Sequence, residues 1–491
     1  MGNKQTLAKI VQKTILQIPL ETKTPLRIAS GFDDGLTDIL ILKNKDNKPF
    51  IPATSLGGVL RSEVASIYGG KLGEDIAQIV FGNISDIDGN QSLINISDVT
   101  LTNAPIIYRD GIKLDSITGV TEKGAKFDFE ALDRGATGNL SLEITIRECN
   151  LQDKRLANFT FKHDEFVANH DIFGDICATI ADIFTQGLSI GSLTTKGYGK
   201  IQSQVPVEFY TFDFSKTADS QAWLAYLDGT LPKKSDYISK HMQTTFGEND
   251  LNLSIDFSLK SSLIIRDYDV DDDQTISDNP DEQGTKITAI QMKSNDDYVI
   301  PGSSIKGVLK SRAFHILMYL THNDEIKTKK FLDEFMGFAE ANTARKSNLF
   351  VNEIYIPSKL SQIKKQIQTR NRIDRFTGGT IDNALFTEEP IWQIDKQANP
   401  IKLNLTVKNC TQAQAGLILL ILKDLWLGNL PIGGGKSIGR GVLQGRKCQI
   451  IAPKLLHNQN FTIEEAHTFK TTGNKQDLEN LVQALVGELN D

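Results

Sequence analysis

Two stretches of twelve residues, Ile51–Ser62 (IPATSLGGVLRS) and Ile300–Ser311 (IPGSSIKGVLKS), are copies of one motif. Seven of the twelve positions are identical, and the copies lie 249 residues apart. A glycine-rich loop follows each copy at nearly the same distance, at Thr195–Lys200 in the first half and at Ser437–Gly441 in the second. Solenoid repeats recur about every 20 to 50 residues, so the longer distance between these two copies predicts the duplication of a whole domain.

Length and composition are those of a globular protein with two large domains. At 491 residues each half is long enough to bury its own core, and the 40 % hydrophobic and 23 % charged content is ordinary. No apolar stretch approaches the roughly 18 residues that span a bilayer, and the N-terminus lacks the features of a secretory signal. Cys149, Cys177, Cys410 and Cys448 are too few and too scattered for a disulfide framework or a C-x-x-C zinc site. The sequence therefore predicts a cytoplasmic protein that does not contact a membrane.

The negative charge of the chain is concentrated in one segment. Eight acids and no Lys or Arg lie between Asp267 and Glu282, while the net charge of the whole chain is -7. The remainder is close to neutral, so the overall acidity does not exclude a nucleic-acid partner. Residues 267–282 are predicted to form a solvated acidic insert in the second domain. A cation-binding loop is the alternative, but the insert lacks the glycine and terminal glutamate placement of an EF-hand.

Hydrophobic periodicity predicts the same order of strands and helices in both halves. In the first half we expect strands at residues 14–20, 26–29, 38–42 and 200–210, and a late helix at 167–186. In the second half we expect strands at 251–265, 287–292 and 441–451, and a late helix at 412–427. Each motif opens a further helix with one apolar stripe that would pack on a sheet. The stripes are Leu56, Val59, Leu60, Val64 and Ile67 in the first half, and Ile305, Val308, Leu309, Ala313 and Ile316 in the second.

The order β-α followed by β-α-β is typical of the split βαβ unit of a ferredoxin-like sheet. We therefore predict an α+β protein with two tandem ferredoxin-like domains, at residues 1–215 and 251–452. Residues 216–250 have little periodicity and are predicted to be a linker. Residues 453–491 are predicted to be a charged C-terminal tail that ends in a short helix near residues 478–489.

The motif places small hydroxyl residues at the start of a helix. Pro52 and Pro301 fix an extended exit from the preceding strand, and free backbone N–H groups at a helix N-terminus readily bind phosphate. An ordinary helix cap is the alternative, but two copies, each paired with a basic glycine-rich loop, favour phosphate binding. The candidate phosphate-binding residues are Thr54, Ser55, Arg61, Ser303, Ser304, Lys306 and Lys310 in the motifs, and Lys196, Lys436 and Arg440 in the loops.

The second glycine-rich loop contains Gly433–Ser437 (GGGKS), which is similar to the end of a nucleotide-binding P-loop. A P-loop requires a glycine five residues before the Gly-Lys pair, and Leu430 occupies that position. The loop also lies near the end of its domain, whereas a nucleotide-binding α/β domain begins with it. The sequence therefore argues against an NTPase.

Three elements in this order resemble the RAMP superfamily of CRISPR effector proteins, in particular the backbone subunits of type III complexes. The Ile-Pro-x-Ser-Ser motif is the first, and the late glycine-rich loop is the third. The middle element is Asp115–Gly119 in the first half and Asn371–Gly379 in the second. The second copy is closer to the family's Ile-Asp-Arg-x-Thr-Gly pattern, because Ser116 and Ile117 replace the Asp and Arg in the first. The resemblance covers residues 14–210 and 251–452.

The resemblance implies that each half is an RRM-like RAMP domain with a β-hairpin thumb and that the protein binds CRISPR RNA. It implies three kinds of partner: the CRISPR RNA, a complementary single-stranded target RNA, and other effector subunits. These subunits are a polymerase-like large subunit and further RAMP backbone and cap subunits. Single-stranded RNA binding needs cations along the backbone and aromatic groups for the bases. Arg372 and Arg375 are therefore further RNA-binding candidates, and Tyr198 and Phe376 are candidates for base stacking or, equally, for core packing.

Several members of the family cut the target RNA with an aspartate in the loop before the Ile-Pro motif. Asp38, five residues before Lys43, occupies that position. An acid that opens an otherwise apolar strand is unusual, because burying it unpaired costs several kcal/mol. Asp38 is therefore the candidate catalytic and metal-binding residue, for Mg²⁺ or another divalent cation, since Mg²⁺ keeps most of its waters and takes one or two protein carboxylates. The second half has Thr288 at this position, so one cleavage site is expected.

Two other functions are compatible with the same resemblance. A non-catalytic scaffold of the complex would bind the guide RNA and the neighbouring subunits without cutting. A guide-processing ribonuclease of the superfamily usually needs a histidine, and no histidine occurs before His163. Asp33 and Asp34, close to Asp38, are expected to be solvated turn residues.

Overall fold

The structure is a computed structural model, in which the chain divides into two compact units. Unit one comprises Met1–Gly111, Lys126–Thr194 and Tyr198–Thr245, and unit two comprises Ile112–Ala125, Thr195–Gly197 and Phe246–Asp491. The structure describes residues 8–33, 35, 37–84, 89–115, 120–158, 169–230, 234, 249–267, 275–276, 285–340, 343–359, 362–395, 401–464 and 470–490.

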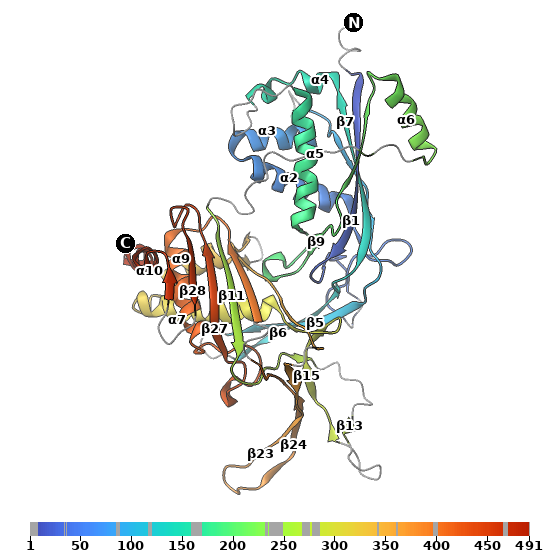
Figure 1. The fold of residues 1–491 in the computed structure, drawn as a ribbon. Coiled ribbons are helices and arrows are strands. Elements are labelled where there is room, and N and C mark those ends of the chain that lie inside the picture. The colour runs from blue at the N-terminus through green and yellow to red at the C-terminus, as the bar shows by residue number, and fades with distance from the viewer. Residues whose placement is uncertain are drawn as a thin grey trace. The chain divides into compact units, whose positions relative to one another are not determined.

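Unit one is built on a six-stranded antiparallel sheet (Figure 1). Its order is β3 (Ile94–Ile96), β7 (Thr137–Arg147), β1 (Ile10–Thr22), β9 (Lys200–Gln202) and β8 (Leu188–Ser189), and β10 (Glu208–Asp213) also pairs with β1. The smaller elements are β2 (Phe50–Ile51), paired with β4 (Val99–Thr100), the short helix α4 (Glu148–Leu151) and the 3-10 turn at Lys154–Asn158. A further 3-10 turn at Thr194–Lys196 begins in unit one, and its last two residues belong to unit two.

Alternation along β1 gives this sheet two apolar faces, because successive side chains of a strand point to opposite sides. Leu16, Ile18 and Leu20 join the core formed with α2 (Ala53–Tyr68), α3 (Gly70–Phe81) and α5 (Asn169–Gln186). Ile15 instead joins a small aromatic cluster with α6 (Thr217–Leu227), in which Trp223 lies 5.1 Å from Phe212, measured between ring centroids.

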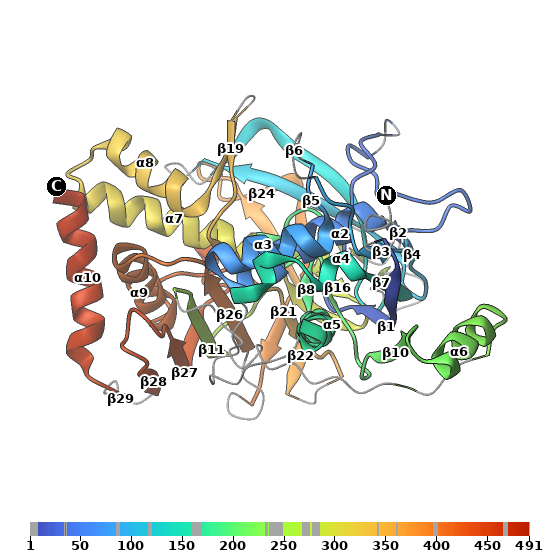
Figure 2. The same cartoon turned by 90° about the horizontal axis from the view of Figure 1, so that it is seen from above.

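Unit two has a second six-stranded sheet, also antiparallel (Figure 2). Its order is β20 (Leu349–Val351), β26 (Ile401–Val407), β11 (Leu251–Leu259), β27 (Leu443–Ile451), β28 (Asn460–Glu464) and β29 (Lys470–Thr472). Its helices are α7 (Gly302–Leu320), α8 (Glu325–Met336), α9 (Gln412–Trp426) and α10 (Lys475–Asn490). Its smaller elements are β16 (Lys293–Ser294), β17 (Asp297–Ile300), β18 (Phe338–Glu340), β19 (Thr343–Arg345), β21 (Ile354–Ile356), β22 (Ile363–Lys365), β25 (Ile391–Gln393), β13 (Thr275–Ile276), β14 (Thr285–Lys286) and a 3-10 turn at Lys436–Ile438.

The strand order confirms the predicted ferredoxin-like arrangement. In unit two the four strands of the unit are, in chain order, β11, β20, β26 and β27. Across the sheet they lie in the order β20, β26, β11, β27, which is the ferredoxin-like order 2-3-1-4, and α7 and α9 are the two crossover helices. In unit one β1, β3, β7 and β9 have the same order, with α2 and α5 in the helix positions.

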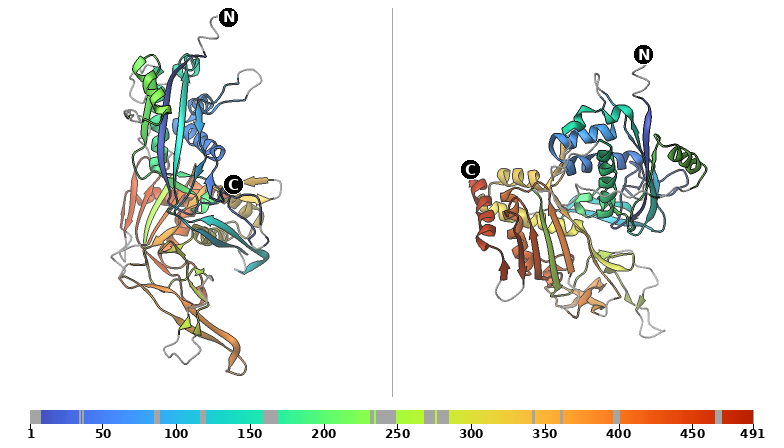
Figure 3. Two further views of the ribbon diagram at one scale, coloured as in Figure 1. Left: turned by 90° about the vertical axis from the view of Figure 1, so that its right-hand side faces the viewer. Right: turned by 45° about the horizontal axis from the view of Figure 1, so that its top comes forward.

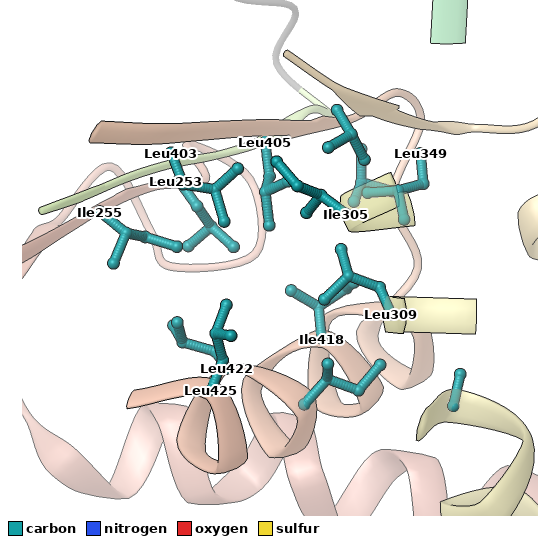
Figure 4. Packing of buried hydrophobic residues seen from close by; sticks show 14 of the residues in the cluster. Leu253, Ile255, Ile305, Leu309, Leu349, Leu403, Leu405, Ile418, Leu422 and Leu425 are labelled. Atoms are coloured by element: carbon teal, nitrogen blue, oxygen red, sulfur yellow. The ribbon is translucent and has the colours of Figure 1, made fainter. Parts of the chain in front are cut away.

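The core of unit two lies between the sheet and its helices (Figure 4). Leu253 and Leu405 point from the sheet toward Ile418 and Leu422 of α9, and all four are almost fully buried. Burial of each such side chain stabilises the fold by about 1.5–3 kcal/mol, so this layer is a main source of stability. Both predicted apolar stripes belong to these cores, with Leu56, Leu60 and Val64 buried in unit one and Ile305, Val308, Leu309 and Ala313 in unit two.

Two of the strand predictions in the first half are wrong. Residues 26–29 and 38–42 make only isolated bridges, among them Ala29 to Ile41 and Ile39 to Phe129. The intervening turn contains Gly31 and Gly35, both with positive φ, and this conformation ends regular pairing. The residues between this turn and the motif therefore lie along a β-hairpin of the first half, which they contact at single bridges, and do not form a strand.

Two predicted boundaries also differ from the structure. The linker expected at 216–250 contains helix α6, which packs on β10 through its aromatic side chains. The apolar face of this helix is short and leaves little periodicity in the sequence. The tail expected at 453–491 is part of unit two: β28 pairs with β27, and α10 packs on α9. Gly416 allows this approach, since a Cβ there would collide with the backbone oxygen of Leu481. The expected helix near 478–489 is confirmed within α10.

Each half carries a β-hairpin between the second and third strands of its sheet. In the first half it consists of β5 (Ile106–Leu114) and β6 (Thr121–Leu132), and in the second of β23 (Gln368–Ile373) and β24 (Thr380–Glu389). The second hairpin is extended by β12 (Arg266–Asp267) and β15 (Ala289–Gln291), and it projects from the rest of unit two (Figure 3). Most of the acidic insert at 267–282 lies outside the described residues.

A buried ion cluster holds the base of the second hairpin against the glycine-rich loop. Arg440 of the loop donates to Glu388 of β24 at 2.6 Å, and both residues are buried, with exposed fractions of 2 % and 7 %. Arg266 and Arg370 donate to the same carboxylate, each at 2.7 Å. Arg440 also donates to the side chain of Gln368 at 2.8 Å, so the loop is bonded to both hairpin strands.

The first half uses aromatic packing at the same place. Tyr198, between the last two glycines of its loop, corresponds to Arg440, and Phe129 of β6 corresponds to Glu388. The two rings pack edge to face with centroids 6.0 Å apart, and the guanidinium of Arg27 lies 4.5 Å from the Phe129 ring. A hydrophobic contact therefore replaces the ion cluster between the loop and the hairpin base.

Glu388→Gln is predicted to destabilise unit two. Burial works to raise the pKa of Glu388, but the hydrogen bonds from Arg266 and Arg440 outweigh it and lower the pKa. Removing one partner of a buried ion pair costs about 3–5 kcal/mol, and we expect the lower end because Arg266 and Arg370 are partly screened by solvent. The midpoint of urea unfolding, followed by Trp392 and Trp426 fluorescence in a Trp223→Phe background, measures the loss.

The pH dependence of this loss gives a second readout. A carboxyl whose pKa is lowered on folding contributes stability above its unfolded pKa, and this contribution disappears as pH falls through the folded pKa. The difference in unfolding free energy between Glu388→Gln and the native chain should therefore shrink as the pH falls below 4.5, the ordinary pKa of a glutamate side chain. Glu389→Gln is the matched control, because its partner Lys365 is exposed and such pairs contribute about 0–1 kcal/mol. Equal effects of the two variants would contradict the assignment.

Candidate functional site

Asp38 pairs with a second aspartate on the first hairpin. The backbone N–H of Asp38 donates to Oδ1 of Asp128 at 2.9 Å, and the backbone N–H of Asp128 donates to Oδ2 of Asp38 at 3.0 Å. The parallel bridge between the next residues, Ile39 and Phe129, aligns the two segments. Asp38 is exposed and Asp128 is half-buried. One oxygen of each carboxylate, Oδ1 of Asp38 and Oδ2 of Asp128, lies outside this pairing.

The second half has threonines at both positions. Strand β15 pairs in parallel with β24, with Ala289 opposite Glu388, which makes Thr288 and Thr387 the counterparts of Asp38 and Asp128. The backbone N–H and the hydroxyl of Thr288 donate to the backbone oxygen of Thr387 at 2.7 and 2.8 Å. This agrees with the alignment of Asp38 with Thr288. Asp128 escaped the sequence analysis because its contact with Asp38 joins residues 90 positions apart.

The N-terminus of α2, where a phosphate was predicted, interacts with a carboxylate of the chain itself. Asp98 accepts a hydrogen bond from the backbone N–H of Ala53 at 2.7 Å. Thr54 is exposed and Ser55 is half-buried, and neither position is the cap, which is Pro52. Because a carboxylate stabilises a helix N-terminus much as a phosphate does, a ligand phosphate here would compete with Asp98.

The N-terminus of α7 differs in this respect. Its cap, Pro301, makes no side-chain hydrogen bond, Ser303 is exposed, and Ser304 is half-buried. Pro301 and Gly302 at this N-terminus are buried, whereas Pro52 and Ala53 at the N-terminus of α2 are half-buried.

The basic side chains predicted to bind phosphate differ in how far solvent reaches them. Arg61 donates to the backbone oxygen of Gly82 at 2.9 Å, and Lys306 is buried and donates to that of Leu349 at 2.7 Å. Burial, reinforced by neighbouring lysines, lowers the pKa of Lys306 to about 7. Arg440 is buried in the ion cluster with Glu388, so it does not face solvent as a phosphate contact would require. Lys196 and Lys310 are half-buried, and Lys436 is exposed.

Glycine is required where each glycine-rich loop turns. Gly199 and Gly441 both have positive φ, and a Cβ at either would collide with a backbone oxygen, of Ile190 or Ile432 respectively. The loops therefore pass close to a neighbouring chain segment, which only glycine permits. Tyr198 is 2 % exposed and packs on Phe129, so the structure assigns it to the core and not to base stacking.

The tip of the second hairpin presents an aromatic and basic surface. Asp374 organises the turn by accepting hydrogen bonds from the backbone N–H groups of Phe376 and Thr377, both at 2.8 Å. The bond from Thr377 and then that from Phe376 lower the pKa of Asp374, so its carboxylate is ionised at neutral pH. Arg372, Arg375 and Phe376 are exposed, Phe376 at 94 %. The corresponding tip in the first half, residues 116–119, lies outside the described residues.

Further apolar side chains of this hairpin are exposed. Ile373, Leu385 and Phe386 have exposed fractions of 60 %, 55 % and 47 %. Large exposed apolar groups beside arginines are typical of surfaces that bind another molecule.

Within the described part of the chain, no group of three or more His, Cys, Asp or Glu side chains could hold a metal ion, and no helix is long and apolar enough to cross a membrane.

Comparison with known proteins gives one family. The model of the RAMP superfamily matches residues 19–202 and 256–444, once in each half. No curated protein matches the chain. A chain of a solved structure described as "Cryo-EM structure of the Type III-B Cmr-beta bound to cognate target RNA" is similar at 18 % identity and a TM-score of 0.29. The match covers 40 % of this chain and 61 % of that one, less than two thirds of its length. Because the family model matches both halves and more than half of the 491 residues, this chain belongs to the RAMP superfamily and contains two tandem copies of its domain.

Proposed function

We propose that this protein is a backbone subunit of a type III CRISPR interference complex, which binds CRISPR RNA and cleaves complementary target RNA at Asp38 in a metal-dependent way. The tandem match to the RAMP superfamily supports the assignment to this class of protein. The exposed carboxylate of Asp38, held in a defined orientation beside the first hairpin, is the observation that carries the cleavage proposal. Its partners would be the guide RNA, the single-stranded target and the other effector subunits, including the polymerase-like large subunit.

The exposed residues of unit two suit the RNA-binding part of the proposal. Phosphates need cations that are free to reach them, and Arg372, Arg375 and Lys436 are exposed. Phe376 offers a ring for stacking on a base, a contact that tolerates any sequence. Lys306 and Arg440 would act differently, by shaping the loop and the motif from inside, because both are buried and hydrogen-bonded.

For cleavage, we propose that Asp38 acts on the ribose 2′-hydroxyl next to the scissile phosphate. The 2′-oxygen attacks phosphorus in line with the P–O5′ bond, which breaks and leaves a 2′,3′-cyclic phosphate and a 5′-hydroxyl. The hydroxyl proton passes to the carboxylate or to water, and the leaving O5′ takes a proton from water. Oδ1 of Asp38, which lies outside the Asp38–Asp128 pairing, suits a hydrated Mg²⁺, which takes one or two protein carboxylates. When bound, such an ion neutralises the charge that develops on the phosphate.

A non-catalytic scaffold is the second candidate, and one observation favours it. The hydrogen bonds between Asp38 and Asp128 tie the segment before the motif to the hairpin, a structural task that needs no chemistry. Unit two performs the same task with Thr288 and Thr387, which lack carboxylates. The two proposals differ in what the loss of the Asp38 charge does to target cleavage.

Removing the exposed arginines of the hairpin tip should weaken RNA binding. Arg372→Ala with Arg375→Ala is expected to lower affinity similarly for all guide sequences and to flatten the dependence of log K on log salt, by about 0.7 for each lost phosphate contact with single-stranded RNA. Lys330→Ala with Lys475→Ala removes the same charge from exposed positions of α8 and α10 and is the control. Fluorescence anisotropy titrations at several salt concentrations measure the slopes, and equal slopes for the two double variants would exclude the tip as a phosphate contact.

Asp38→Asn should abolish one cleavage product in the assembled complex. Asparagine keeps a side-chain oxygen for the N–H of Asp128 but loses the charge, so target affinity should stay unchanged while one band disappears from a gel of labelled target RNA incubated with Mg²⁺. Thr288→Ala is the matched variant in the second half and should remove no band. An intact pattern for Asp38→Asn would favour the scaffold, and a band lost in Thr288→Ala would place catalysis in the second half as well.

A further inference from the structure

We propose that Asp128 is the positioning residue of the cleavage site: it orients the Asp38 carboxylate through its hydrogen-bonding oxygen and not through its charge. This inference rests on the proposed function, because it concerns the site at Asp38. The sequence and the family match assign no role to Asp128. Two observations carry the inference, the reciprocal hydrogen bonds of the two aspartates and the paired difference between the two halves of the chain.

The reciprocal bonds fix both parts of Asp38. Oδ1 of Asp128 holds the backbone N–H of Asp38, and the N–H of Asp128 holds Oδ2 of Asp38, so neither the main chain nor the side chain can rotate without losing a hydrogen bond. The segment before Asp38 contributes little order, because it contains glycines with positive φ at 31 and 35 and forms only isolated bridges. The orientation of Oδ1 of Asp38, the oxygen left for RNA, therefore depends on Asp128.

The second half shows what the fold itself requires. Thr288 bonds to the backbone oxygen of Thr387, an acceptor that any residue at that position would supply. A carboxylate at the Asp128 position is thus unnecessary for joining the segment to the hairpin.

The two positions differ together between the halves, acid with acid and threonine with threonine. An acid at Asp128 accompanies the acid at Asp38, and neither is present in the second half. Since the strand pairing is common to both halves, the acid at Asp128 serves the function of Asp38. The first half differs from the second in one respect: the side chain of Asp128 accepts from the Asp38 N–H, and the backbone N–H of the same residue donates to the Asp38 carboxylate.

The experiment compares Asp128→Asn with Asp128→Ala in the complex assembled with guide RNA, labelled target and Mg²⁺. Asparagine keeps Oδ1 as an acceptor and should retain the Asp38-dependent cut within a few-fold, with an unchanged pH profile. Alanine loses the acceptor and should lower kcat on the order of 10²-fold, the effect of misplacing a reacting group by about 1 Å, while target affinity stays the same. Thr387→Ala keeps its backbone oxygen and is the control in unit two, where the cleavage pattern should not change.

Hydrogen exchange tests the positioning independently of cleavage. Mass spectrometry of the full chain should show faster exchange of the Asp38 amide in Asp128→Ala and native exchange in Asp128→Asn, because only alanine removes the acceptor. Loss of the cut in both variants would overturn the proposal in favour of a direct role of the Asp128 charge. Full activity or native exchange in Asp128→Ala would also overturn it. If Asp38→Asn leaves every band in place, the proposed cleavage fails, and the exchange data still decide whether Asp128 positions Asp38.

Discussion

The contact between the glycine-rich loop and the base of the hairpin is the constraint on which the rest of the candidate site depends. In unit two it is a buried carboxylate, Glu388, that accepts hydrogen bonds from Arg440, Arg266 and Arg370. A buried charge is tolerated only with such partners, so loop and hairpin must keep their relative position for the cluster to exist. In the first half the edge-to-face packing of Phe129 and Tyr198 holds the loop against the hairpin base. This contact is less directional than the ion cluster, but it does not require the burial of a carboxylate.

The same contact also affects the position of the candidate catalytic residue, because neighbouring side chains of β6 point to opposite sides of the strand. Phe129 points into the small core that includes Tyr198, and Asp128, one residue earlier, belongs to the opposite side of β6, as successive side chains of a strand do. One strand therefore holds the loop on one side and Asp38 on the other. A shift of the hairpin by a single residue would exchange the two sides and break both contacts. The glycine-rich loop thus contributes, through β6, to the placement of the carboxylate.

Local patterns in the sequence predicted what depends on local patterns. The helices of the motifs, the late helices and the ferredoxin-like order follow from apolar periodicity and from the duplication, and all are present in the structure. The errors concern contacts between distant residues. Residues 38–42 are predicted to form a strand because four consecutive apolar residues follow Asp38, yet they pair with the hairpin at isolated points. The acid partner of Asp38, the carboxylate at the N-terminus of α2 and the burial of Arg440 each depend on residues 45 to 90 positions away, which spacing within one motif cannot reveal.

The duplication makes the chain its own comparison. Where both halves keep a feature with the same residues, such as the glycines that let each loop approach a backbone oxygen, the fold itself demands it. Where two contacting positions change together, the geometry is kept and the chemistry differs. Glu388 with Arg440 against Phe129 with Tyr198 is a change in how the loop is held, by hydrogen bonds to a buried carboxylate in one half and by ring packing in the other. Asp38 with Asp128 against Thr288 with Thr387 is of another kind, because the strand pairing itself does not need the two acids. An acid pair that the strand pairing does not require, present in one copy and absent from the other, supports the proposal that cleavage belongs to the first half.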